Sequence, residues 1–496
     1  MTTRHPWLLP ALVGLLAFLF RAVGLTSAND LFVDELTYAR LASAVAGGHL
    51  PNLSGQPFFL HPPGAFLLDG LLIDVFGLDG PTVDLVDRLR WGHAVLGVAV
   101  VVLGYLLARR ATTPVIAAVV GVVLATDPFV LRNDSRVMLE TPTTAALLAG
   151  WLVLLTGTSR LRAVAAGLLF GGAILTKDIA AVLVVLPLLL ATVWRRTLAP
   201  RRVLITVAAA AVPYGVYLVT LLATGDLAAW WAAKSLGLRR MIGLVQLTGF
   251  NAPETPGLGG RLVDQATHFG TSYVLIGLCV VAGVLASLSA HRVRRMLGLI
   301  ATTSGAFGVY AAAAGTLEEQ FGYYVLVPST LALGVLAVEN AERGLVNRRL
   351  VTGVVATFTA LTAVLGVAAR ATTDDSYRRA YDWLTANVPA GTPVGLTNVT
   401  AEFAFLPRPG YGVWPSLRSL SDHDAHYVLT QSRSLAAGYG YAAPELLTWL
   451  EHNASTAFAV DGPSGGRTTV WRLDPGTLRH AVAGGLSTPP VTGPHH

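Results

Sequence analysis

The chain has 496 residues, of which 53% are hydrophobic and only 13% charged, and its mean hydropathy is +0.57. Soluble domains carry about 25% charged residues, so this composition excludes a single water-soluble body and predicts an integral membrane protein. The net charge of +6 does not indicate nucleic-acid binding, because the basic residues lie in short clusters between apolar runs. The single cysteine, Cys279, excludes an internal disulfide and a cysteine-based metal site.

Apolar runs long enough to cross a bilayer recur along most of the chain. Eleven spans are predicted, near residues 7–25, 88–108, 112–127, 142–158, 161–176, 178–194, 203–223, 271–290, 295–314, 321–339 and 350–369. Residues 60–78 are also apolar, but Pro62-Pro63, Asp69 and Asp74 interrupt them. That segment is predicted to be a re-entrant helix, an interfacial helix or a further span. The expected fold is a polytopic α-helical membrane protein with about 11 spans.

The connectors between these spans predict the topology. Alternate short loops are basic, at Arg109-Arg110, Arg160/Arg162, Arg195-Arg196 with Arg201-Arg202, Arg292/Arg294-Arg295 and Arg343 with Arg348-Arg349. The positive-inside rule assigns such loops to the cytoplasm, which makes the N-terminus cytoplasmic. The long loops 26–87 and 224–270 are then extracytoplasmic. Each contains an amphipathic aromatic stretch, Leu31 to Val45 and Trp230 to Leu247, suited to a helix in the membrane interface.

The composition changes near residue 371, after the membrane domain of residues 1–370. Residues 371–485 are predicted to form a small extracytoplasmic α/β domain. Its expected helices run to Asn387 and over Pro444 to Glu451, and its expected strands are Pro393 to Leu396, Tyr427 to Leu429, Thr456 to Val460 and Thr468 to Leu473. The Pro/Gly-rich tail, residues 486–496, is predicted to be disordered.

The acidic pair Asp34-Glu35 lies about ten residues past the first span. Carboxylates at a membrane face are costly unless they are solvated or used, and one placed there can act as general base toward an acceptor hydroxyl. The alternative is a solvated loop pair, or a helix N-terminus whose dipole favours acidic side chains.

Several cationic side chains also fall on the predicted external face. His61 precedes Pro62-Pro63 and can bind a phosphate or a hydroxyl, although an interfacial turn explains it equally well. Lys177 lies at the external end of a span, where it either snorkels to the interface or neutralises a lipid-linked phosphate. Arg239 and Arg240, near two tryptophans, suit either a phosphate or interfacial anchoring.

Two further external segments complete the candidate set. The loop 127–140 places Arg132, Asp134, Arg136 and Glu140 close together, and the i,i+4 spacing of Arg132, Arg136 and Glu140 lets one helical face present all three. The alternative is a self-neutralising salt-bridged turn. The segment from Glu318 to Tyr323 and Tyr324 opens a late span; the tyrosines read as an aromatic belt, which leaves the acids unexplained.

These residues together resemble the GT-C superfamily of polyprenyl-phosphate-sugar glycosyltransferases, of the protein O-mannosyltransferase and lipid A aminoarabinose transferase type. The resemblance covers roughly residues 7–340. It is carried, in chain order, by Asp34-Glu35 with Tyr38, His61-Pro62-Pro63, Arg136 and Glu140, Leu175-Thr176-Lys177, and Tyr323-Tyr324 with Pro328. The segment Tyr377 to Pro389 looks like the external domain of actinobacterial members.

The resemblance implies a site residue by residue. Asp34 is the implied general base, Glu35 an orienting acid and Glu140 a second acid; Lys177, Arg132 or Arg136, and Arg239 or Arg240 are implied to stabilise the leaving phosphate. Tyr38, His61, Asp134, Glu318, Tyr323 and Tyr324 complete the expected substrate-binding set. The resemblance also implies displacement at the anomeric carbon with inversion, a polyprenyl-phosphate-linked sugar as donor, and a glycan, a lipid or a protein as acceptor.

Two questions about the resemblance and two alternative functions remain open from the sequence. The aminoarabinose type usually has a basic residue where Thr37 or His61 stands, which puts the donor sugar and a lipid A acceptor in doubt. Some relatives use a divalent metal, and the sequence does not decide this. A lipid or solute transporter would need ionisable residues at mid-span or broken helices in paired halves. A non-catalytic cell-envelope scaffold would leave the external acids unused.

Overall fold

A computed structural model describes residues 7–245, 249–252, 257–344, 347–406, 408–436, 440–488 and 490. The chain divides into two compact units, each considered by itself. The first comprises Met1–Val23, Leu41–Gly77 and Leu89–Arg370, and the second comprises Gly24–Arg40, Leu78–Arg88 and Ala371–His496. Most of the predicted tail, 486–496, lies outside the described residues.

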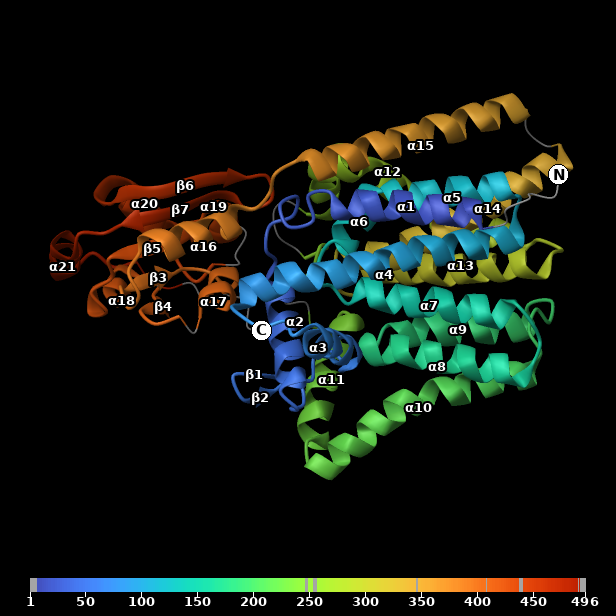
Figure 1. Cartoon of the computed structure of the whole chain (residues 1–496), viewed down its shortest axis with the longest axis horizontal. Coiled ribbons are helices and arrows are strands. Elements are labelled where there is room, and N and C mark those ends of the chain that lie inside the picture. The colour runs from blue at the N-terminus through green and yellow to red at the C-terminus, as the bar shows by residue number, and fades with distance from the viewer. Residues whose placement is uncertain are drawn as a thin grey trace. The chain divides into compact units, whose positions relative to one another are not determined.

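The first unit is a bundle of helices (Figure 1). Its elements are α1 (Leu8–Ala22), β1 (Asn52–Leu53), β2 (Gln56–Pro57), α3 (Gly64–Phe76), most of α4 (Thr82–Ala111), α5 (Pro114–Thr126), α6 (Pro128–Asp134), α7 (Glu140–Leu155), α8 (Arg160–Thr176), α9 (Ala180–Val193), α10 (Pro200–Thr224), α11 (Leu227–Met241), α12 (Leu258–Ser287), α13 (Arg292–Ala313), α14 (Phe321–Arg343) and α15 (Arg348–Ala371).

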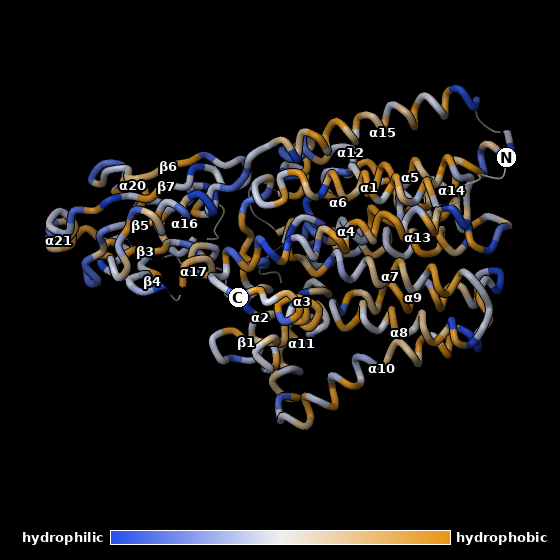
Figure 2. Tube along the Cα trace, viewed as in Figure 1, coloured by the Kyte–Doolittle hydropathy of each residue, from blue (hydrophilic) through white to orange (hydrophobic). Residues whose placement is uncertain are grey.

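Each of the eleven predicted spans overlaps one helix of this bundle. Within the described residues, six helices are long and apolar enough to cross a membrane, and seven if the bent pair α5–α6 is one span. Figure 2 shows the apolar composition of these helices in orange. The chain is therefore a multi-pass membrane protein, while eleven crossings stays a prediction. Residues 60–78, which the sequence left as a re-entrant helix, an interfacial helix or a further span, contain α3. The predicted amphipathic stretch Trp230–Leu247 overlaps α11, and residues 246–247 lie outside the described part.

Local sequence signals explain where several of these helices begin. Thr113 caps α5 ahead of Pro114, and Ser159 caps α8 by accepting from the Arg162 amide. Asp127 caps α6 by accepting from the amides of Phe129 and Val130, with Pro128 following it. The extended backbone of Asp127 therefore ends α5 and starts α6, and the two helices meet at 61°.

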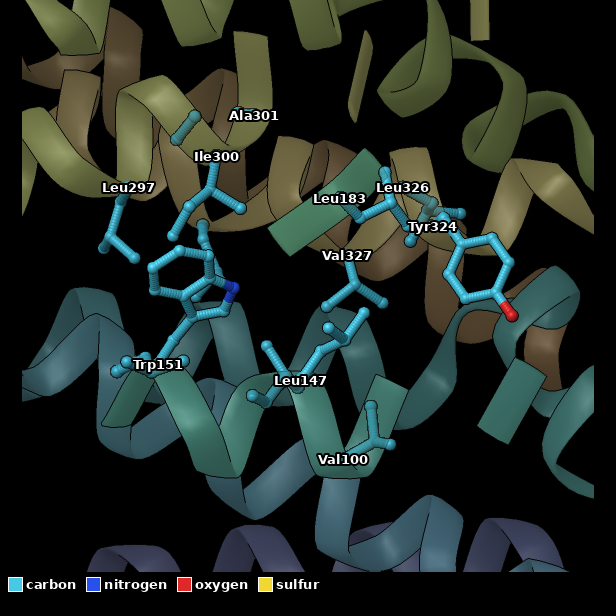
Figure 3. Packing of buried hydrophobic residues seen from close by; sticks show 14 of the residues in the cluster. Val100, Leu147, Trp151, Leu183, Leu297, Ile300, Ala301, Tyr324, Leu326 and Val327 are labelled. Atoms are coloured by element: carbon cyan, nitrogen blue, oxygen red, sulfur yellow. The ribbon is translucent and has the colours of Figure 1, made fainter. Parts of the chain in front are cut away.

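Large side chains fill the centre of the bundle, and glycines allow its helices to approach closely. The Trp151 and Phe170 rings lie with centroids 4.7 Å apart. A Cβ on Gly171 would lie 2.6 Å from the Ala210 carbonyl oxygen, so only glycine permits this α8–α10 contact. Figure 3 shows the buried cluster, including Val100, Leu147, Leu183, Leu297, Ile300, Leu326 and Val327.

One predicted helical face is wrong. Arg132, Arg136 and Glu140 do not share a helix, because α6 ends at Asp134 and α7 begins only at Glu140. The Ser135 backbone (φ −97°, ψ 8°) leaves the helical region, and the Met138 amide then bonds the Arg136 carbonyl. The i,i+4 spacing therefore runs across a turn.

The second unit contains a five-stranded mixed sheet of order β4-β3-β5-β7-β6. β3 pairs in parallel with β4 and β5, while β5–β7 and β6–β7 are antiparallel. Its elements are the first part of α2 (Val33–Ala46), the start of α4, α16 (Ser376–Asn387), β3 (Val394–Leu396), α17 (Val399–Phe405), β4 (Tyr411–Val413), α18 (Leu417–Asp422), β5 (Tyr427–Gln431), α19 (Ser432–Ala436), α20 (Pro444–Asn453), β6 (Ser455–Gly462), β7 (Gly466–Arg472) and α21 (Pro475–Ala483). The predicted strands and helices of residues 371–485 all form, and β4, α17, α18, α19 and α21 are additional.

Candidate functional site

A buried ion pair joins the start of α7 to the end of α8. Lys177 donates from Nζ to Glu140 Oε1, and the two side chains are 8% and 0% exposed. Glu140 is the first residue of α7 and Lys177 follows the last residue of α8, so each charge is favoured by the dipole of its own helix. Within the described residues Glu140 Oε2 accepts no hydrogen bond. The pair thus keeps one buried carboxylate oxygen available to a ligand donor.

His61 lies between β2 and α3 and is surrounded by positive charge. Burial, and then the charges of Lys177, Lys234 and Arg240, hold the pKa of this imidazole well below its usual value. His61 is therefore neutral near pH 7 and can offer a hydrogen bond without adding charge. The loop before α3, the end of α8 and α11 together supply a basic cluster, which we define as His61, Lys177, Lys234 and Arg240.

Each cation of α11 in this cluster is held by a carboxylate. Lys234 Nζ lies 2.5 Å from Asp178 Oδ2 and 3.1 Å from the Leu60 carbonyl oxygen. Arg240 Nη2 lies 2.9 Å from Glu318 Oε1. These pairs position the cations without closing them off, because Asp178 is 42% exposed and Glu318 is partly exposed. A ligand phosphate can therefore compete for the same N–H groups.

Arg132 and Glu319 form a neighbouring pair at 2.7 Å. The Arg132 guanidinium also lies over the rings of Phe129 and Phe269, at 5.1 Å and 4.4 Å from their centroids. Stacking and pairing together hold this side chain in one orientation. No contact described for Arg239 joins it to the cluster, and Arg136 is half-buried in the turn between α6 and α7.

Asp134 is the centre of a saturated buried network. Its Oδ2 accepts from Arg21 Nε at 3.0 Å, and its Oδ1 accepts from Thr141 at 2.9 Å and from the Tyr323 hydroxyl at 2.5 Å. Gly97 packs here, where a Cβ would lie 2.6 Å from Arg21 Nε. Because both carboxylate oxygens are occupied, this geometry favours a structural role for Asp134 and Tyr323 in joining α1, α6, α7 and α14.

Tyr324 and two further polar pairs complete the interior of the first unit. Tyr324 is buried beside Glu140, whose charge is the nearest one acting on its hydroxyl. His93 Nε2 lies 3.2 Å from Asp69 Oδ1, with both side chains buried. Asp178 also accepts from Tyr214 at 2.8 Å.

The acidic pair predicted to be catalytic lies in the first turn of α2, in the second unit. Glu35 is fully buried, and its Oε2 accepts from the Phe32 amide at 3.3 Å, which stabilises the start of the helix. Asp34 is partly exposed. Tyr38, one turn later, is buried. The two neighbouring acids therefore differ: Glu35 is held inside and Asp34 remains accessible.

Asp30 ties the loop before α2 to α16 within the second unit. Its carboxylate accepts from the Ser376 hydroxyl at 2.5 Å, the Tyr377 amide at 3.0 Å and the Leu31 amide at 2.9 Å. Burial raises the pKa of Asp30 to about 6. Sequence reasoning missed this residue, as it missed Arg21 and His93, and it gave no site role to Asp69, Asp178 or Glu319. A charged residue inside or just after an apolar run was the available signal for Arg21.

No group of three or more His, Cys, Asp or Glu side chains suited to a metal ion occurs in the described part of the chain.

Comparisons with known proteins bear on the fold. Residues 60–225, about a third of the chain, match the family described as dolichyl-phosphate-mannose-protein mannosyltransferase. The crystal structure of ArnT from Cupriavidus metallidurans bound to undecaprenyl phosphate superposes with TM-score 0.57 at 16% identity, covering 95% of this chain and 98% of that one. The chain therefore has the fold of this membrane glycosyltransferase structure.

A second solved structure shares this fold. The archaeal oligosaccharyltransferase AglB from Archaeoglobus fulgidus, in complex with an inhibitory peptide and a dolichol-phosphate, has TM-score 0.54 at 14% identity, covering 94% of this chain and 74% of that one. No curated protein sequence matches the chain. The GT-C fold expected from the sequence is confirmed, and the roles of individual residues stay predictions.

Proposed function

We propose that this GT-C protein transfers a sugar from a polyprenyl-phosphate donor to an acceptor hydroxyl on the extracytoplasmic face of the membrane, with inversion at the anomeric carbon. The acceptor is a glycan, a lipid or a protein. The observation that carries the proposal is the basic cluster, in which the positive charges of Lys177, Lys234 and Arg240 all act on His61 and Lys234 Nζ lies 3.1 Å from the carbonyl oxygen of the adjacent Leu60. Two proteins of similar fold were solved with a lipid phosphate, undecaprenyl phosphate in ArnT and dolichol-phosphate in AglB.

The basic cluster suits the leaving group of this reaction. As the bond between the anomeric carbon and the phosphate oxygen breaks, that oxygen keeps the electron pair and the lipid phosphate gains negative charge. Cations that are already positioned stabilise such charge without reorganising during the step. Lys177 is positioned by Glu140, Lys234 by Asp178 and Arg240 by Glu318. Neutral His61 adds a hydrogen bond to the same phosphate, and Glu140 Oε2 remains to accept from a donor-sugar hydroxyl.

The nucleophilic half of the reaction is assigned to Asp34. The acceptor oxygen forms its new bond to the anomeric carbon, and its proton passes to the Asp34 carboxylate. Asp34 suits this role better than Glu35 because it is accessible, while Glu35 is buried and occupied with the Phe32 amide. Glu35 is then a positioning residue that holds the first turn of α2. Tyr38 lies one helical turn from Asp34, on the same face.

The distribution of arginines supports the proposed orientation. Arg160 is the first residue of α8, and Lys177 follows its last residue. Arg201 is the second residue of α10 and Arg292 the first of α13, at the arginine-rich end. The positive-inside rule assigns the arginine-rich end to the cytoplasm. The Lys177 end of α8 then faces outward, the N-terminus is cytoplasmic, and residues 371–485 are extracytoplasmic.

The test is release of polyprenyl phosphate by the purified full chain from a panel of synthetic undecaprenyl-phosphate hexoses and pentoses. Asp34→Asn is expected to abolish release while the protein retains its melting temperature. Asp74→Asn, which changes an exposed acid of α3, is the matched control and is expected to keep full activity. Full activity of Asp34→Asn would remove Asp34 as the base. Transport of the lipid with no release from any donor would overturn the transferase proposal.

A further inference from the structure

A second charged feature of the bundle lies at the opposite end of α8 from Lys177. The 17 residues of α8 separate the two features by about 25 Å. A pocket of about 440 Å³ lies there, within the usual size of ligand sites. Its lining includes five arginines and no acid: Arg160, Arg196, Arg201, Arg202 and Arg292. Figure 2 shows a hydrophilic stretch at this end of α8 and α10.

Arg202 shows that the pocket lacks an acceptor. Its side chain is only 8% exposed, and Nη2 donates to the carbonyl oxygens of Leu154 and Gly157. Its Nε and Nη1 are buried and have no hydrogen-bond partner among the described residues. Leaving charged N–H groups buried without an acceptor is costly. An anion in the pocket would satisfy them.

Topology alone does not explain this arrangement. The positive-inside rule requires basic residues in exposed loops, not a buried guanidinium lining a pocket. Arg294, in the same turn of α13 as Arg292, is neutralised by Glu339 at 3.1 Å and Glu342 at 2.6 Å. In the described part of the chain, none of the five pocket arginines has a carboxylate within salt-bridge distance. The neighbouring Arg294 is thus compensated, whereas the pocket keeps its positive charge.

The surroundings of the pocket indicate where its ligand comes from. Leu161 of α8 and Leu204 of α10 adjoin lining residues Arg160 and Ile205 in sequence, and these leucines are 78% and 69% exposed. On a membrane-spanning helix such side chains contact lipid acyl chains. Exposed apolar side chains therefore occur on the same turns of α8 and α10 as the pocket lining. That is the environment of a phospholipid headgroup, and basic pockets between spanning helices on the cytoplasmic side suit anionic headgroups.

We propose that this pocket binds the phosphate headgroup of an anionic membrane phospholipid, with one of the two unpartnered N–H groups of Arg202, at Nε or Nη1, donating to a phosphate oxygen. The exposed arginines Arg160, Arg196 and Arg201 surround the headgroup, and the acyl chains lie along α8 and α10. This site is separate from the basic cluster and does not depend on the transfer reaction. Planar guanidinium groups match phosphate oxygens in paired hydrogen bonds.

The test is native mass spectrometry of the full chain in neutral detergent, titrated with phosphatidylglycerol and, separately, with phosphatidylcholine. The pocket variant is Arg160→Gln/Arg196→Gln/Arg201→Gln, which changes only exposed side chains and spares Arg202, whose helix contacts support folding. The control variant is Arg109→Gln/Arg110→Gln/Arg348→Gln, which removes the same charge from exposed arginines outside the pocket.

The wild type is expected to bind phosphatidylglycerol at least about tenfold more tightly than phosphatidylcholine. The pocket variant is expected to lose that preference and the control variant to keep it. Equal loss in both variants would overturn the proposal in favour of general surface charge. A third titration uses inorganic phosphate as competitor. Displacement of phosphatidylglycerol by millimolar phosphate would also overturn it, because the site would then recognise a soluble phosphate and not a lipid.

Discussion

The Lys177–Glu140 pair allows structure and catalysis to be separated in one double-mutant cycle. Lys177→Met removes the partner of a Glu140 carboxylate that is fully buried. Breaking a buried pair from one side costs about 3–5 kcal/mol, because an uncompensated charge remains inside. Removing charge from both partners, as in Glu140→Gln/Lys177→Met, is expected to restore most of that stability.

Activity is expected to behave differently from stability in this cycle. If Lys177 stabilises the leaving phosphate, its loss lowers turnover by about 10²–10³-fold, the usual effect of removing one preorganised charge. The double variant then folds but stays inactive. Lys234→Met provides a contrast, because its partner Asp178 is 42% exposed and can turn to solvent. That variant is expected to lose turnover at a stability cost of only about 0–1 kcal/mol.

The assays are unfolding of the purified full chain by SDS titration, followed by tryptophan fluorescence, and release of polyprenyl phosphate at saturating donor. A double variant that recovers both stability and wild-type turnover would refute the reasoning, since Lys177 would then serve only to balance the charge of Glu140. A Lys177→Met variant as stable as the wild type would refute the structural part, because the pair would not be a buried ionic contact.

Three further predictions concern packing and pH. Gly171→Ala places a Cβ 2.6 Å from the Ala210 carbonyl oxygen and is expected to destabilise the bundle by about 1–3 kcal/mol. At the control position, Gly172→Ala, the new Cβ meets no atom within 4 Å, so this variant is expected to be neutral or slightly stabilising. Equal melting temperatures of the two variants would contradict this prediction. The pKa of Asp30 is raised from 3.8 in the unfolded chain to about 6 in the fold. The protonated Asp30 therefore adds about 3 kcal/mol to the free energy of unfolding below pH 4, and this stabilisation is lost as the pH rises through 6. Asp30→Asn is expected to remove the change in the free energy of unfolding between pH 4 and 6. A pH profile of that free energy that is unchanged in the variant would exclude Asp30 as the source of the change. Burial, and then its positive neighbours, depress the pKa of His61, and the negative charge of a bound phosphate raises that pKa. The ratio of wild-type to His61→Gln affinity for undecaprenyl phosphate is therefore expected to grow as the pH falls from 7 to 5. A constant ratio would exclude His61 from the phosphate site.

Helix positions were predictable because hydropathy and local capping act over short distances. Ser159 and Thr113 mark the starts of α8 and α5 in the sequence itself. Helix α4 begins at Thr82, six residues before the predicted span 88–108, because its first turns carry Asp84 and Asp87 and are not apolar. Hydropathy detects only the part of a helix that contacts lipid.

The contacts between side chains of different helices could not be predicted from the sequence. Glu140 and Lys177 were each identified as site residues, but nothing in their spacing showed that they form one pair 37 residues apart. Asp134 looked like a ligand-binding acid, and only the structure shows both of its oxygens occupied, by Arg21, Thr141 and Tyr323. Such contacts depend on how helices pack, which local propensity does not encode.

The most direct test of the central claim is a cryo-electron microscopy structure of the full chain with undecaprenyl phosphate. The account predicts phosphate density within hydrogen-bonding reach of Lys177 Nζ, about 3 Å away. His61, Lys234 and Arg240 are expected around the same density. Phosphate density elsewhere, with the Lys177 cluster closed by its own ion pairs, would contradict the assignment of this cluster as the leaving-group site.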